Sequence, residues 1–155
     1  MPAYTDTLGF YKNSVGFTSN YTHRISVVEV DIDFARIAAA RSAAGAAALA
    51  ATDTLVVAVL PRGALILGGA TTLVRAEGAA GTIDFGITGT LTLFNSNFSV
   101  NGTAGDTAGS TTPAYLTADT NVVMTIDTNN IDVARVKLSI AMVNLGADLG
   151  VIPSA

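Results

Sequence analysis

Alternation of apolar and polar residues is the clearest pattern in the chain. In residues 24–33 the even-numbered positions from 28 to 32 are aliphatic, and the odd-numbered positions from 29 to 33 are acidic. Residues 135–143 repeat the pattern, with aliphatic side chains or methionine at even-numbered positions and Arg135, Lys137 and Ser139 between them. Because successive side chains of a strand point to opposite faces, both segments are predicted to be half-buried strands.

Shorter apolar and β-branched runs between turn residues predict further strands. Residues 54–60 form a β-branched run that is apolar on both faces, which is typical of a central or interfacial strand. A turn at residues 61–63 is expected to return the chain as an antiparallel hairpin over residues 64–67, followed by a bulge at Gly68 and Gly69. Other strands are expected at residues 71–77, 82–87, 90–94 and 122–126, and a long polar loop at residues 95–113.

One short helix interrupts these strands. Between Phe34 and Ala44 the apolar spacing changes and alanine, the best helix former, predominates. Asp33 stands where an N-cap belongs, and Gly45 stands where the residue after a helix end belongs. We therefore expect a helix between these two residues.

About eight strands with turns between them predict a mainly β protein, an antiparallel β-sandwich or jelly roll with one short Ala-rich helix and an extended N-terminal arm. A barrel is the alternative architecture. The expected organisation is an arm at residues 1–23 and a single sandwich domain at residues 24–155.

The arm is distinguished by its aromatic residues. It is polar and punctuated by glycine and asparagine, yet it holds five of the ten aromatic residues of the chain, Tyr4, Phe10, Tyr11, Phe17 and Tyr21. Ordering such a segment has a large entropic cost, so it can become ordered only if nearly all its rings find a surface. We expect these rings to dock on the body of the protein or on a partner; a disordered terminus is the alternative.

Composition suits a protein with large interfaces. Of the 155 residues, 50% are hydrophobic and only 13% are charged, whereas about 25% are charged in a typical soluble domain. No run approaches the roughly 20 apolar residues of a spanning helix, and the N-terminus lacks the pattern of a signal peptide. The net charge of −4 argues against a nucleic-acid partner. We expect neither a membrane nor a nucleic acid as partner.

Catalytic chemistry finds little support in the sequence. Cysteine is absent, and His23 is the one histidine. No G-x-S-x-G nucleophile motif occurs, and the glycines at 63, 68 and 69 are not followed by the G-K-[ST] of a phosphate-binding loop. The prediction is therefore a protein that is not an enzyme, with no catalytic residues and no cofactor.

An acidic row is the most notable candidate binding feature. Glu29, Asp31 and Asp33 share one strand face at a spacing of about 7 Å. They could bind a partner, remain a solvated face beside Arg24 or Arg36, or ligate Ca²⁺, which takes oxygen ligands. The first two interpretations outweigh the third, so no metal site is predicted.

Residues 28–59, VEVDIDFARIAAARSAAGAAALAATDTLVVAV, followed by LPRGALIL, resemble small alanine-rich structural proteins of tailed bacteriophages. The resemblance covers about residues 25–90. It implies a capsid decoration, or cement, protein that bridges neighbouring subunits of the major capsid protein. It further implies a homodimer or homotrimer on the exterior of the virion capsid, made in the host cytoplasm.

Two other functions stay open at this level. One is a tail, baseplate or head-fibre structural component. The other is a carbohydrate-binding module for host attachment, although the lack of tryptophan counts against it.

Overall fold

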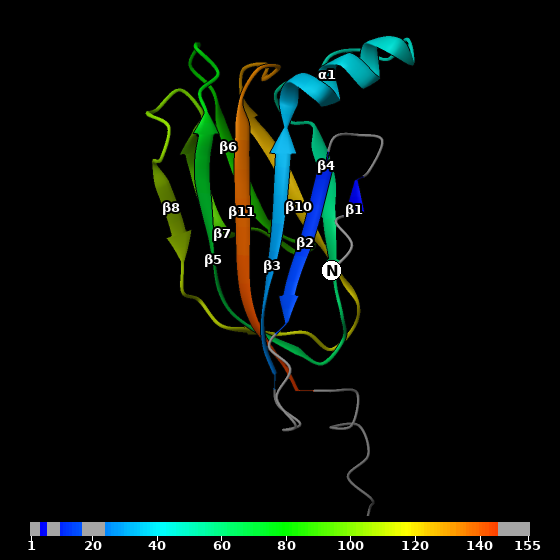
Figure 1. Ribbon diagram of the computed structural model, residues 1–155, viewed down its shortest axis with the longest axis vertical. Helices are drawn as coiled ribbons and strands as arrows, with labels where there is room; N and C mark the ends of the chain where they lie inside the picture. The colour runs from blue at the N-terminus through cyan, green and yellow to red at the C-terminus, as the bar shows by residue number, and fades with distance from the viewer. Residues whose placement is uncertain (1–3, 6–9, 17–23, 146–155) are drawn as a thin grey trace, which may run out of the picture.

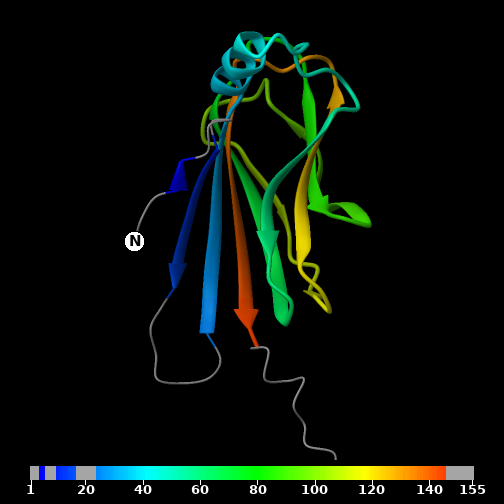
Figure 2. The same cartoon turned by 90° about the vertical axis from the view of Figure 1, so that its right-hand side faces the viewer.

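The strands of the chain form two antiparallel sheets that face each other (Figures 1 and 2). The computed structural model describes residues 4–5, 10–16 and 24–145. These contain one helix, α1 (Phe34–Ala43), and eleven strands: β1 (Tyr4–Thr5), β2 (Phe10–Gly16), β3 (Arg24–Asp33), β4 (Thr54–Leu60), β5 (Ala64–Arg75), β6 (Thr82–Ile87), β7 (Thr90–Ser99), β8 (Thr107–Ser110), β9 (Ala114–Tyr115), β10 (Thr120–Thr128) and β11 (Arg135–Asn144).

The larger sheet has seven strands in the order β1-β2-β3-β11-β5-β8, with β9 also paired to β5. The smaller sheet has four strands in the order β4-β10-β6-β7. The expected fold class, a mainly β antiparallel sandwich with one short helix and an extended N-terminal segment, is confirmed. Seven of the eleven strands correspond to expected ones, because two expected strands merge into β5, and the four that were not expected are β1, β2, β8 and β9.

The alternating segments bury their apolar faces between the two sheets. Val30 of β3 lies opposite Leu138 of β11, and both side chains are fully buried. One apolar cluster takes side chains from both sheets and from α1. The predicted inward faces of residues 28–32 and 136–142 are therefore confirmed.

The ends of α1 follow the predicted capping pattern. At the N-terminus, Asp33 Oδ1 accepts a hydrogen bond from the backbone N–H of Ala35 at 3.1 Å. At the C-terminus, Gly45 has a left-handed φ of 68° and donates its N–H to the Ser42 carbonyl at 3.0 Å. The N–H of Ala46 donates to the Arg41 carbonyl at 2.8 Å, which completes a Schellman ending.

The expected hairpin between residues 54–60 and 64–67 is wrong. β4 pairs with β10 in the smaller sheet, whereas β5 belongs to the larger sheet, so the turn at residues 61–63 connects the two sheets. The backbone N–H of Arg62 donates to Asp119 Oδ1 at 2.8 Å, and that of Gly63 donates to the Leu116 carbonyl at 2.8 Å. The corner is thus held by a distant loop and not by pairing of its own strands.

The expected long loop at residues 95–113 is also wrong in part. β7 continues to Ser99, and β8 pairs with β5. These strands carry many small polar residues because main-chain pairing at a sheet edge does not require an apolar side chain. At Gly109 the two backbones approach so closely that a Cβ atom would lie 2.4 Å from the Gly69 carbonyl oxygen. Separate strands were also expected at 64–67 and 71–77; they form one strand, β5, whose register shifts beside Gly68.

Candidate interaction surfaces

The outer face of the seven-stranded sheet changes character along its strands. Near α1 the outward positions of β3 are acidic, and those of β11 begin with Arg135 and Lys137. Toward the other end the outward positions become Val27 on β3 and Ala141 on β11, which lie opposite each other. The face therefore has a charged half and an apolar half.

Asp31 in the charged half is paired with an arginine from β11. Arg135 donates from Nε to Asp31 Oδ1 at 2.9 Å and from Nη2 to Asp31 Oδ2 at 2.6 Å. This two-point contact with Asp31 raises the pKa of the Arg135 guanidinium, an effect that burial partly opposes. Such a forked contact fixes both side chains and keeps Arg135 charged.

Asp33 is paired with an arginine from β5, through a single hydrogen bond. Arg75 Nη2 donates to Asp33 Oδ1 at 2.8 Å, and Arg75 also donates to the Val133 carbonyl at 2.8 and 2.6 Å. Asp33 thus caps α1 and anchors β5 at once. The arginines that pair with Asp31 and Asp33 lie 104 and 42 residues away in the sequence, which is why local spacing did not reveal them.

Glu29 makes no hydrogen bond or ion pair within the described residues. In the same part of the chain no group of three or more potential metal ligands gathers. Near the end of β10, Thr82 Oγ1 donates to Asp127 Oδ2 at 3.1 Å, and in the loop that follows, Asn129 Nδ2 donates to the Ala80 carbonyl at 2.8 Å. These two hydrogen bonds join the end of β10 and the loop after it to residues 80–82, so they are structural.

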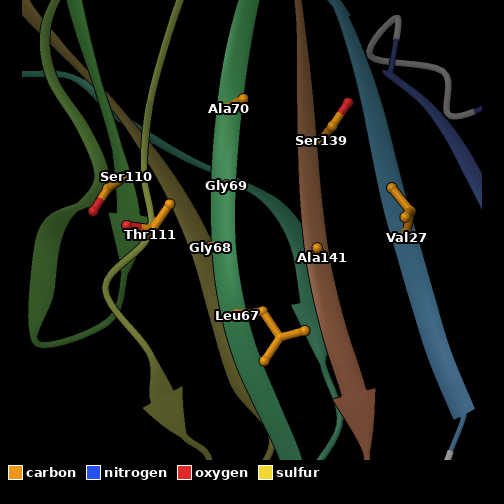
Figure 3. Close-up of a pocket in the computed structure, with 9 residues that line it drawn as sticks. All are labelled: Val27, Leu67, Gly68, Gly69, Ala70, Ser110, Thr111, Ser139 and Ala141. Carbon is orange, nitrogen blue, oxygen red and sulfur yellow. The ribbon is translucent and has the colours of Figure 1, made fainter.

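The apolar half of the outer face contains a shallow groove of about 410 Å³ (Figure 3). Its floor is low because glycine, alanine and serine occupy the facing positions of β5 and β11. The lining residues are Val27, Leu67, Gly68, Gly69, Ala70, Ser110, Thr111, Ser139 and Ala141. None of them is titratable, so the groove offers apolar and hydroxyl contacts and no group for acid–base or nucleophilic chemistry.

The N-terminal segment supplies two strands of the seven-stranded sheet, β1 and β2. The backbone of β2 pairs antiparallel with β3, with Phe10 opposite Ile32 and Tyr11 opposite Asp31, and Tyr4 of β1 pairs with Lys12. The described parts of the arm therefore lie along the body of the same chain. Phe17 and Tyr21 lie outside the described residues, as does His23, and the partner-binding role of the five aromatic rings stays a prediction.

Among the titratable groups of the described residues, Glu77 accepts the most hydrogen bonds from the backbone. It accepts from the N–H groups of Asp132 at 3.1 Å, Val133 at 2.9 Å and Ala134 at 2.6 Å. Burial raises the pKa of Glu77, but these bonds outweigh it and hold the pKa below its ordinary value. The contact with Glu77 raises the pKa of Asp132. The Glu77 carboxylate thus joins the segment after β5 to the loop before β11.

No helix in the described residues has both the length and the apolar character needed to cross a bilayer.

Comparisons with known proteins identify the fold. No protein-family model matches the chain, and no curated protein matches its sequence. Among solved structures, a chain of the acidic stable capsid structure of Helicobacter pylori bacteriophage KHP30 is similar with a TM-score of 0.54 and 13% identity, over 87% of this chain and 94% of that one.

Two further similarities are weaker. A chain of the cyanophage Pam1 capsid asymmetric unit has a TM-score of 0.49 and 19% identity, over 78% of this chain and 82% of that one. A chain of the capsid of Ralstonia phage GP4 has a TM-score of 0.48 and 17% identity, over 77% of this chain and 84% of that one. The similarity to the KHP30 chain shows that this fold occurs in a phage capsid structure, which agrees with the resemblance seen in the sequence.

Proposed function

We propose that the protein is a structural virion component that decorates the exterior of a phage capsid and stabilises it by bridging neighbouring subunits of the major capsid protein. The observation that carries this proposal is the similarity of the fold, over 87% of the chain, to a chain of the KHP30 capsid structure. At 13% identity this similarity establishes a shared fold, and the strand order and the surfaces of the protein add support for the function.

Strand order supports the proposal. From β3 onward the larger sheet runs β3-β11-β5-β8, and the smaller sheet runs β4-β10-β6-β7. We interpret this order as a double Greek-key jelly roll, an architecture that recurs in viral capsid and lectin domains. The architecture alone leaves both kinds of domain open.

The surface favours a protein partner over a small-molecule substrate. The groove on the outer face lacks titratable residues, and several large apolar side chains are exposed in the described part of the chain: Ile25, Val56, Val59, Leu67, Val74, Leu91, Tyr115 and Val133. Carbohydrate-recognising sites are usually built around exposed aromatic rings, and Tyr115 is the one aromatic residue in this group. A decoration protein needs such apolar contact area on more than one side.

The proposed partners are the major capsid protein and further copies of this chain, as a homodimer or homotrimer. The N-terminal rings and the outward Glu29 are the proposed contacts with the capsid subunits. Because Asp31 and Asp33 already have arginine partners, we propose that they shape this face and contribute less to binding.

Copy number tests the proposal. Purified particles should contain the protein in a fixed ratio to the major capsid protein, comparable to the number of subunit junctions, as measured by quantitative mass spectrometry. A few copies per particle would instead indicate a tail, baseplate or head-fibre component. Absence from particles together with hits on a glycan array would indicate a carbohydrate-binding module.

A further inference from the structure

β4 forms an edge of the smaller sheet, and the backbone groups along its outer side pair with no other strand of the described residues. Figure 2 shows β4 on the side toward the viewer, at the edge of the smaller sheet beside β10. An edge strand presents unpaired N–H and C=O groups, which is why natural proteins usually shorten such strands or place charges or proline within them.

β4 carries a bulge at Val57, but it has neither charges nor proline within its seven residues. Its sequence, TLVVAVL, contains no charged residue, proline or glycine. Val56 is 53% exposed and Val59 is 49% exposed. A register shift at Val57 leaves both Val57 and Ala58 buried, so Leu55 and Leu60 share the core side while Val56 and Val59 share the outer side.

We infer that β4 is a self-association edge, at which β4 of a second copy of this chain pairs antiparallel about a two-fold axis and joins the two four-stranded sheets. This inference deepens the proposed self-association by naming its surface. One register keeps inward residues opposite inward residues across the axis. It places Leu55 opposite Leu60 of the second copy and Val56 opposite Val59 of the second copy.

Charge complementarity supports this register. The same alignment places Asp53, just before β4, opposite Arg62 of the second copy, just after β4, and the two-fold axis repeats the pair. Asp53 uses Oδ2 to accept the Ala50 N–H at 2.9 Å, which leaves its Oδ1 available. The guanidinium of Arg62 makes no hydrogen bond or ion pair within the described residues, since only its backbone N–H is bonded, to Asp119. A parallel arrangement would instead bring like charges together.

The small area of the proposed β4–β4 contact limits the expected affinity of the dimer. Pairing of one short strand buries less than the roughly 1,200–2,000 Å² of a standard stable interface. The free protein should therefore form a reversible dimer whose population depends on concentration. On a shell, where neighbouring copies are held close together, a weak contact gains from the high effective concentration.

Charge reversal tests the inference on the full-length chain. Arg62→Glu places two acidic side chains opposite each other, and Asp53→Arg places two arginines opposite each other. Each variant alone should weaken the dimer at least about tenfold, or about 1.4 kcal/mol, in sedimentation equilibrium. An equimolar mixture should restore dimerisation, because each of the two pairs across the axis then joins one acidic and one basic side chain.

Lys137→Glu is the matched control, since it makes the same charge change on the outer face of the other sheet, away from β4, and should leave the dimer unchanged. Recovery in the mixture also shows that both variants are folded. The inference is overturned if the wild-type chain stays monomeric, if it forms a trimer, or if the mixture does not recover. Shell binding is measured separately: a monomer that binds shells contradicts this inference alone, and a dimer that ignores shells contradicts the proposed function alone.

Discussion

The ring of Phe94 occupies the space that a side chain on Gly69 would need. A Cβ atom placed on Gly69 would lie 2.5 Å from Cδ1 of Phe94, well inside contact distance. Gly69 belongs to β5 of the larger sheet and Phe94 to β7 of the smaller sheet, so this contact fixes how closely the two sheets approach. The glycine is therefore required by packing between the sheets.

Gly69→Ala should destabilise the protein by about 1–3 kcal/mol, the usual effect of overpacking a core. Urea unfolding followed by circular dichroism measures the change. The double variant with Phe94→Leu should recover part of the loss, because the ring that meets the new methyl group is gone. Equal stability of Gly69→Ala and the wild type would show that the sheets separate freely.

Asn95 should be equally sensitive. Its Oδ1 accepts the Phe85 N–H at 3.1 Å, its Nδ2 donates to Thr71 Oγ1, and both Asn95 and Thr71 are buried. Asn95→Leu leaves these two groups without a partner and should lower the free energy of unfolding by about 1–3 kcal/mol. The neighbouring exposed Ser96→Ala is the control and should change it by about 0.5 kcal/mol or less. An Asn95→Leu protein as stable as this control would contradict the role assigned to the amide.

Glu77 should make stability depend on pH. Because its pKa is lowered in the folded state, the charged form stabilises the fold above the pKa of the unfolded state, and this contribution is lost as pH falls through the lower folded pKa. Glu77→Gln should therefore cost about 1 kcal/mol at pH 7, since the carboxylate is partly exposed.

The difference between Glu77→Gln and the wild type should shrink below about pH 4 as the wild-type carboxyl becomes protonated. Thermal unfolding of both proteins across this range measures it. The raised pKa of Asp132 affects stability in the opposite direction to the lowered pKa of Glu77. Glu77→Gln also removes the contact with Glu77 that raises the pKa of Asp132. A constant difference between pH 3 and pH 7 would contradict this account.

Removal of residues 1–22 should separate folding from assembly. The sandwich should keep its core, because the apolar cluster of the described side chains consists of residues from Val28 onward. The truncated chain should remain folded by circular dichroism but bind shells more weakly, since it lacks the five aromatic residues of the arm. Shell binding as tight as that of the full chain would show that the arm serves only to cover the edge of β3.

The sequence predicted those parts of the fold that depend on local pattern. The bounds of β3 and β4 and both caps of α1 follow from alternation, β-branched runs and capping residues. The partner strands of β4 and β5 did not follow, because a turn such as residues 61–63 serves a hairpin and a crossing between sheets equally well. β8 was missed because its pairing depends on the backbone of β5 and not on its own side chains.

The candidate surfaces show the same division. The acidic row was visible from its two-residue period, but Arg135 and Arg75, which pair with Asp31 and Asp33, are brought there by the sheet order. The groove was invisible in the sequence because it is formed by small residues from several separate strands. Its signal, Gly68 beside a register shift, suggested a bulge and nothing more.

The central claim, that the protein stabilises a phage shell, is tested most directly by the temperature at which shells rupture. Particles stripped of the protein should release their DNA at a lower temperature than intact particles, as followed by a fluorescent DNA dye. Adding back the purified full-length chain should restore the original temperature in proportion to the number of bound copies. An unchanged rupture temperature in stripped particles that have lost every copy would contradict the claim.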